Sequence, residues 1–248
     1  MELSFIYAVI GFSLAGLSVF GNDSIQTLGT FIAAKKKWYK WYVLATAASV
    51  VLVVTLTYGW IVYDGDITFG RLNKIPYIEI QWYHAVAPLV LVMLTRVGIP
   101  VSTTFLVLSA FASTVILEKV LVKSIMGYAL AAVIAYVIWI VLSRIINEKF
   151  DKVENIKQWR VFQWLTTGFL WYTWLSHDMA NIAVFLPREL PLTMLIGIML
   201  LCTALLFYIF YEKGGRIQKI VLDKTGTRFV RSATIIDGVY AFILLYFK

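Results

Sequence analysis

The chain has 248 residues, of which 60% are hydrophobic and 15% are charged, and its mean hydropathy is +0.81. This composition excludes an ordinary soluble domain, because several apolar runs are long enough to cross about 30 Å of hydrocarbon at about 1.5 Å per residue. The net charge of +8 is spread over short loops rather than gathered on one face, which argues against nucleic-acid binding. We therefore predict an all-α polytopic membrane protein embedded in the lipid bilayer of the plasma (inner) membrane.

Seven apolar segments follow one another along the chain, and polar or turn-forming residues interrupt three of them. The first segment is interrupted at Gly21, the third at Gly98 and Pro100, and the fifth at His177 and Asp178. These interruptions predict broken helices. The segments are 3–34, 41–62, 83–117, 120–143, 158–186, 190–211 and 229–247.

Lysine and arginine in the short loops orient these segments. The loops 35–40, 144–160 and 212–231 carry net charges of +4, +2 and +4, whereas the loop 63–82 carries −1. Because basic loops of membrane proteins face the cytoplasm, we expect the first three loops to be cytoplasmic. The segment 83–117 must then enter and leave on the same side, as a re-entrant hairpin.

Asp23 and Asp178 occupy corresponding places in the two halves of the chain. Each lies in a long interrupted segment, which is followed by an uninterrupted segment and a loop containing Gly-Arg. Since the loop charges give the two halves opposite directions, we predict inverted-topology repeats, the plan by which secondary transporters bind substrate and ion where broken helices meet. The predicted parts are a first repeat (1–117, with its hairpin bent at 98–104), a connecting helix and cytoplasmic loop (118–157), and an incomplete second repeat (158–248).

The stretch "GIPVSTT" at 98–104 predicts an anion site. Pro100 removes a backbone donor and ends the preceding helix, while Ser102, Thr103 and Thr104 can cap the next helix and leave its first N–H groups free. Such a helix start satisfies the acceptor oxygens of an anion such as phosphate. The alternative is that these hydroxyls bond to their own helix or allow helices to pack closely.

The two aspartates predict a cation site. Together with side-chain or backbone oxygens of Asn22, Gln26 and Asn181, their carboxylates offer the oxygen ligands that suit sodium. A bound cation would cancel the repulsion between the carboxylates and an anion, so that each would favour the binding of the other. The alternative is that each aspartate forms an ion pair with a base such as Arg96 or Arg188.

His177 has three interpretations: it donates to a phosphate oxygen, carries a coupling proton, or bonds to a carbonyl. A metal-hydrolase site would need further ligands, and His84 is the only other histidine. No nucleophile and base stand at useful spacing. We therefore predict that the protein is not an enzyme and has no cofactor, with bound sodium as its only metal ion.

Three stretches resemble the signatures of the inorganic phosphate transporter (PiT) family. "FGNDSIQTLGT" is similar to the family's Gly-Ala-Asn-Asp-x-Ala-Asn-x-x-Gly-Thr, with Gln26 in place of the second Asn. "SHDMAN" resembles its second copy, with His177 in place of an Asn, and "GIPVSTT" resembles the family's hairpin bend Leu-Pro-Val-Ser-Thr-Thr. The matching positions are Asn22, Asp23, Gly29, Thr30, Pro100 to Thr104, Asp178, Ala180 and Asn181, followed by "GGRIQKIV" at 214–221.

The resemblance implies a transporter that couples inorganic phosphate to sodium or protons by alternating access. It implies a phosphate site at Ser102, Thr103, Thr104, His177 and Asn181. It implies a cation site at Asn22, Asp23, Gln26, Asp178 and Asn181.

The family repeats Pro-Val-Ser-Thr-Thr in its second half, and no such stretch follows Gly215 here. We therefore expect either that the missing hydroxyls come from a continuation of the chain past Lys248, from a homo-oligomer or from a second polypeptide, or that this variant works without them. Two alternatives follow from this departure and from the site chemistry. One is a relative without transport activity that acts as a membrane binding, sensing or assembly subunit, and the other is a transporter of sulfate or another tetrahedral oxyanion.

Overall fold

The computed structural model describes residues 3–35, 39–73, 75–99, 101–111, 114–149, 156–214, 217–219 and 230–246. Within these residues the regular elements are helices, and no strand occurs. The all-α prediction is therefore confirmed. Three helical stretches are long and apolar enough to cross a bilayer, namely Leu3–Gly29, Trp41–Val62 and Leu192–Tyr211.

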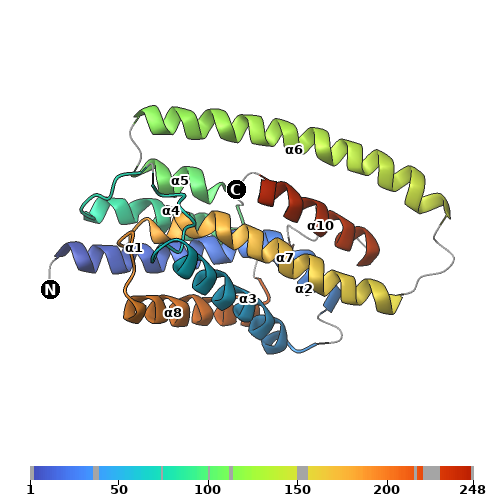
Figure 1. Ribbon diagram of the computed structural model, residues 1–248, viewed down its shortest axis with the longest axis horizontal. Coiled ribbons are helices and arrows are strands. Elements are labelled where there is room, and N and C mark those ends of the chain that lie inside the picture. The colour runs from blue at the N-terminus through green and yellow to red at the C-terminus, as the bar shows by residue number, and fades with distance from the viewer. Residues whose placement is uncertain are drawn as a thin grey trace.

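The predicted apolar segments correspond closely to the helices (Figure 1). The segment predicted at 41–62 is one helix with the same bounds, and the ends of the last two segments lie within two residues of the ends of their helices. In chain order the elements are α1 (Leu3–Val19), the π-helical turn η1 (Phe20–Ser24), α2 (Ile25–Lys35), α3 (Trp41–Val62), the 3-10 turn η2 (Trp82–Ala85), α4 (Val86–Val97), α5 (Thr103–Ser109), α6 (Thr114–Lys149), α7 (Ile156–Ala183), α8 (Leu192–Tyr211) and α10 (Val230–Tyr246).

The predicted helix breaks have three different outcomes. At Gly21 the helix is not broken, because one π-helical turn joins α1 to α2; such turns often occur at functional sites. The predicted break at His177 and Asp178 is wrong, since α7 continues to Ala183. Neither residue removes a backbone donor as proline does, and the side chains of both find partners on other helices.

The third break is present and forms a hairpin. α4 ends at Gly98, whose φ of +85° is a left-handed conformation that suits glycine. α5 then begins at Thr103 and contacts α4, so the chain turns back on itself between them. Pro100, which we expected to end the helix, lies outside the described residues.

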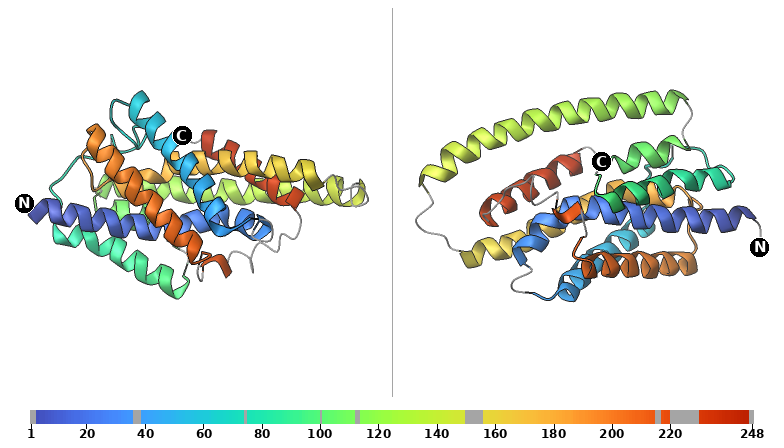
Figure 2. Two further views of the ribbon diagram at one scale, coloured as in Figure 1. Left: turned by 90° about the horizontal axis from the view of Figure 1, so that it is seen from below. Right: turned by 180° about the vertical axis from the view of Figure 1, so that it is seen from behind.

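α7 lies at the centre of the bundle and packs against α1, α2, α3, α5 and α10 (Figure 1). α3 pairs with α8, and α4 packs along α1. α6 lies apart from the other helices and contacts α5 (Figure 2). This arrangement puts α7, with its aspartate, next to both η1 and the hairpin.

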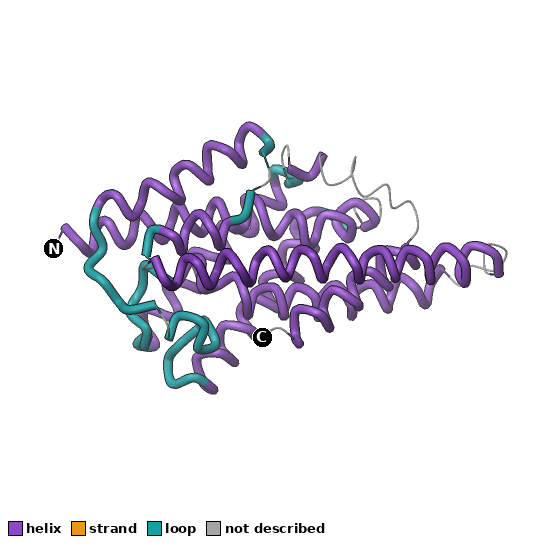
Figure 3. Tube along the Cα trace, turned by 90° about the horizontal axis from the view of Figure 1, so that it is seen from above, coloured by secondary structure: helices purple, strands orange, loops and turns teal. Residues whose placement is uncertain are grey.

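The helix ends that adjoin the basic loops all lie toward one end of the bundle. α2, α6 and α8 finish toward the same end, and α3, α7 and α10 start from it (Figures 1 and 2). These are the helix ends next to the three basic loops, much of which lies outside the described residues. The longest described loops, 63–73 and 75–81, gather at the opposite end near the start of α1 (Figure 3).

Large aromatic side chains fill the centre of the bundle. Trp171 is 1% exposed, stacks on Trp174 with 4.8 Å between ring centroids, and donates its indole N–H to the carbonyl of Ala48 at 3.0 Å. Phe185 is fully buried and packs edge-on against Phe111. Because lipid is as apolar as these side chains, close packing and hydrogen bonds between helices hold such a bundle together.

Gly11 on α1 tests this packing. A Cβ at Gly11 would lie 2.3 Å from Cε1 of Phe185, a ring that has no room to move. Gly11→Ala should therefore destabilise the protein by about 1 to 3 kcal/mol, measured as a lower melting temperature in detergent. Gly197→Ala on α8 is the control, since nothing lies within 4 Å of its added Cβ. Equal melting temperatures for the two variants would contradict the packing described here.

Candidate functional site

The hairpin between α4 and α5 carries the predicted hydroxyl residues. Ser102 is the N-cap of α5, and its Oγ accepts a hydrogen bond from the backbone N–H of Phe105 at 3.5 Å. Thr103 and Thr104 form the first turn of α5. α5 contacts both α1 and α7, so this turn lies between the two helices that carry the aspartates.

The π-helical turn η1 binds the hairpin directly. Nδ2 of Asn22 donates to the carbonyl of Val101 at 2.8 Å and also to Oδ1 of Asp23. The hydroxyl of Thr103 donates to the other carboxylate oxygen, Oδ2 of Asp23. Both oxygens of Asp23 therefore accept hydrogen bonds, one from its own turn and one from the hairpin.

α7 binds the same hairpin turn from the other side. The hydroxyl of Thr104 donates to Oδ1 of Asp178 at 3.4 Å. Nδ2 of Asn181 is 2.9 Å from Oδ1 of Asp178, 2.9 Å from Oγ1 of Thr104 and 3.3 Å from Oγ1 of Thr103. Adjacent threonines thus connect two aspartates that are 155 positions apart in the sequence.

A cavity of about 320 Å³ opens at this point. A water molecule needs only about 10 to 15 Å³ by the same measure, so the cavity admits a hydrated ion. Of its lining residues, Thr103 is buried while Ser102 and Gln26 are exposed; Asn22 and Asn181 are buried behind the lining, bonded to Asp23, Val101, Asp178 and the threonines. The cavity is lined by Asp23, Gln26, Val101, Ser102, Thr103, Thr104 and Asp178.

The structure thus brings eight of the nine predicted site residues together, and His177 is the exception. It does not line the cavity, and its Nε2 lies 2.6 Å from the carbonyl of Leu244 on α10. This contact corresponds to the third interpretation of His177, a bond to a carbonyl. The function of the other eight residues remains a prediction.

The bases that we weighed as ion-pair partners bond elsewhere. Arg96 donates to the hydroxyl of Tyr208 at 3.3 Å, and Arg188 donates to the carbonyls of Leu186 and Ile75. Arg71, in the loop after α3, interacts electrostatically with Asp178 instead.

Sequence reasoning missed two groups that act on the site. One is Arg71, whose charge acts on Asp178 and which the sequence marks only through the Gly-Arg loop that recurs in both halves. The other is the carbonyl of Val101, which accepts from Asn22 and which no side-chain pattern identifies.

The arrangement suits a cation. The hydroxyl hydrogens of Thr103 and Thr104 are directed at carboxylates, so the lone pairs that Asn181 does not occupy, on these hydroxyls and on the carboxylates, remain as ligands. Oδ1 of Asn22 is buried and accepts no hydrogen bond from the described part of the chain. Buried oxygen acceptors of this kind are the ligands that hard cations take. Within the described residues no group of three or more His, Cys, Asp or Glu side chains could hold a metal ion.

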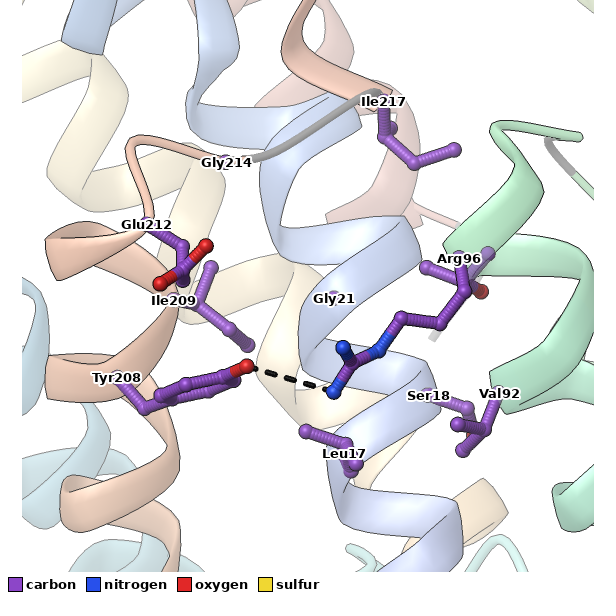
Figure 4. A pocket seen from close by; sticks show the side chains of 11 residues that line it. Leu17, Ser18, Gly21, Val92, Arg96, Tyr208, Ile209, Glu212, Gly214 and Ile217 are labelled. Carbon is purple, nitrogen blue, oxygen red and sulfur yellow. Dashed lines mark hydrogen bonds between the residues drawn. The ribbon is translucent and has the colours of Figure 1, made fainter.

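A second cavity, of about 210 Å³, lies beside the same π-helical turn (Figure 4). Gly21 and Ser18 form part of its wall, and Arg96 of α4 reaches across α1 toward Tyr208 of α8. Gly21 thus faces this cavity while Asp23, two residues later, faces the first one.

No protein-family model, curated protein or solved structure matches this chain.

Asn181 tests the network that joins α7 to the hairpin. Asn181→Ala removes the donor to Asp178 and both threonines, and should destabilise the protein by about 1 to 3 kcal/mol. Thermal unfolding in detergent measures this loss. Thr46→Ala is the control, because Thr46 is exposed and bonds only within α3. If both variants melt at the wild-type temperature, the network contributes nothing to stability.

Proposed function

We propose that the protein transports inorganic phosphate together with sodium or protons, by alternating access between two inverted halves of the chain. One observation carries the proposal: Asp23 and Asp178, from opposite halves, lie at one polar cavity and accept hydrogen bonds from neighbouring threonines. An acid inside a membrane costs about 2.5 to 3.5 kcal/mol, and such acids commonly lie on ion pathways. No covalent step is part of this function.

The hydrogen bonds suggest how cation and phosphate are coupled. The hydroxyls of Thr103 and Thr104 donate to the carboxylates. A cation bound to the carboxylates would compete for the same oxygens and free these hydroxyls to rotate. The released hydrogens, together with Ser102 and the amide of Gln26, could then donate to phosphate. Since α5 has only seven residues, we assign the anion to these side-chain donors rather than to a helix dipole.

Helix packing supports the inverted-repeat part of the proposal. α4 packs along α1 as α10 packs along α7, and α3 pairs with α8. The members of each corresponding pair run in opposite directions, which is visible for α1 and α7 and for α3 and α8 (Figure 1). These pairings are those expected if η1 and α7, with their aspartates, are equivalent by an inverted repeat.

The sorting of helix ends supports the proposed orientation in the membrane. The ends next to the basic loops 35–40, 144–160 and 212–231 are directed to one end of the bundle (Figure 2). We propose that this end is cytoplasmic in a plasma (inner) membrane, in keeping with the rule for lysine and arginine.

The position of α10 bears on the missing hydroxyls of the second half. The carbonyl of Leu244, near the end of α10, contacts His177, the neighbour of Asp178 in the sequence. We propose that hydroxyls of a homo-oligomer or of a second polypeptide complete the phosphate site.

Neutralising the aspartates tests the function. Asp23→Asn and Asp178→Asn should each weaken sodium- or proton-dependent phosphate binding about 10- to 100-fold, because hydrogen bonds and contacts of charged groups contribute about 1.5 to 3 kcal/mol. Binding of radiolabelled phosphate is measured in detergent across a sodium series and a pH series, with sulfate as a competitor. The control is Asp64→Asn, since Asp64 is an exposed loop acid whose φ of +49° an asparagine tolerates.

Each outcome has a clear meaning. Unchanged cation dependence in both aspartate variants would exclude the ligand role. Equal competition by sulfate would identify a less selective oxyanion site. A wild-type protein that binds the cation but binds neither phosphate nor sulfate at any concentration would favour a binding or assembly subunit over a transporter.

A further inference from the structure

A buried acid lies outside the site described above. Asp237 is on α10, and its side chain is 4% exposed. Thr167 on α7, itself 3% exposed, donates its hydroxyl to Oδ2 of Asp237 at 2.7 Å. An ionised carboxylate in such an enclosed position is strongly disfavoured unless a positive charge or a proton compensates it.

An unpaired amide lies one helical turn from Thr167, the residue that binds this carboxylate. Gln163 is one turn before Thr167 on α7, and residues four apart share a helix face. Its side chain is 0% exposed, and neither Nε2 nor Oε1 has a hydrogen-bond partner among the described residues. Leaving such an amide unpaired costs about 1 to 3 kcal/mol, so the native protein is expected to satisfy it in some state.

α10 approaches α7 closely at this level. Gly238 follows Asp237, and a Cβ there would lie 3.5 Å from Cγ2 of Thr166. α7 and α10 lie side by side in Figures 1 and 2. The acid therefore faces a helix interface and not the lipid.

Lys35 and His177 stand about two turns or more from Thr167 along α7. Nζ of Lys35 on α2 bonds to the carbonyl of Arg160, which is seven residues, or about 10 Å, before Thr167 along α7. His177 is ten residues, or about 15 Å, beyond Thr167. The other titratable and charged side chains on the described parts of α2, α7 and α10 are Lys35, Arg160, Tyr172, His177, Asp178, Arg231, Tyr240 and Tyr246.

We propose that Asp237, Thr167 and Gln163 form a site for one monovalent cation, either a proton or a sodium ion, between α7 and α10. A proton on the carboxyl would be donated to Oε1 of Gln163, and a sodium ion would take oxygen ligands from the same three side chains. Thr167 is eleven residues, or about 16 Å, from Asp178 along α7, so this site is separate from the cavity at Asp23 and Asp178. It does not depend on phosphate being the substrate.

Infrared difference spectroscopy on phosphate-free protein tests the proposal. The background is the Asp23→Asn, Asp178→Asn double variant, which removes the signals of the other buried site acids. Lowering the pH should produce a band of a protonated carboxyl group, and adding Asp237→Asn should abolish it. Adding sodium at constant pH, with a large organic cation as the comparison, distinguishes the two ligands. If sodium binds, it should convert the protonated band to a carboxylate band.

A second variant guards against misfolding of the triple variant. Thr167→Val keeps the acid and the side-chain shape but removes the donor to the carboxylate. It should raise the titration midpoint of the band by about one to two pH units, because a hydrogen bond to a charged group is worth about 1.5 to 3 kcal/mol. Thr166→Val is its matched control, since Thr166 bonds within α7, and should leave the midpoint unchanged.

A pH-dependent or sodium-dependent band that disappears with Asp237 supports the site, whatever the outcome of the phosphate experiments. The proposal is overturned if the Asp237 signal is insensitive to both pH and sodium. It is also overturned if the Thr167→Val variant titrates as the Thr166→Val variant does. Asp237 would then be a permanently neutral or permanently paired structural acid.

Discussion

The structure depends on how two acids are accommodated inside an apolar helix bundle. Asp23 and Asp178 are held by hydrogen bonds from Thr103, Thr104 and two asparagines, all supplied within one hairpin turn and the two helices beside it. Since an acid within a membrane costs about 2.5 to 3.5 kcal/mol, these donors are needed for the bundle to form at all. The same hydrogen bonds hold the hairpin between α1 and α7. They therefore stabilise the fold and position the site residues at the same time.

The π-helical turn η1 follows from this constraint. In a regular α-helix through Phe20–Ser24, successive side chains would be about 100° apart around the helix axis. The wider π-helical turn changes this angle, and so it changes the direction in which each side chain points. In the structure Gly21 lines one cavity and Asp23 the other, although only two residues separate them. Under the proposed function, the turn would stand between two compartments of a transport pathway, with the Arg96–Tyr208 hydrogen bond crossing the second one.

Much of this fold can be predicted from the sequence, because apolar length and loop charge are local signals. α3 was predicted to the residue, and the hairpin followed from loop charges together with Gly98 and Pro100. The break at His177 and Asp178 was wrong because a polar pair in an apolar segment was taken for a backbone interruption. Their partners are Leu244 and Thr104, which are distant in the sequence, and such pairs leave a helix intact. Asp237 was overlooked for a related reason: its burial depends on how α10 packs against α7, and no motif marks it.

Under the proposed function, a cation at Asp23 and Asp178 and phosphate at the hairpin favour each other's binding. Isothermal titration of the wild-type protein with phosphate at a series of sodium and proton concentrations, and with sodium at a series of phosphate concentrations, tests it most directly. Reciprocal linkage requires the phosphate Kd to fall as the coupling cation rises, and the cation Kd to fall by the same factor as phosphate rises. A phosphate Kd that is independent of both sodium and pH would contradict the account.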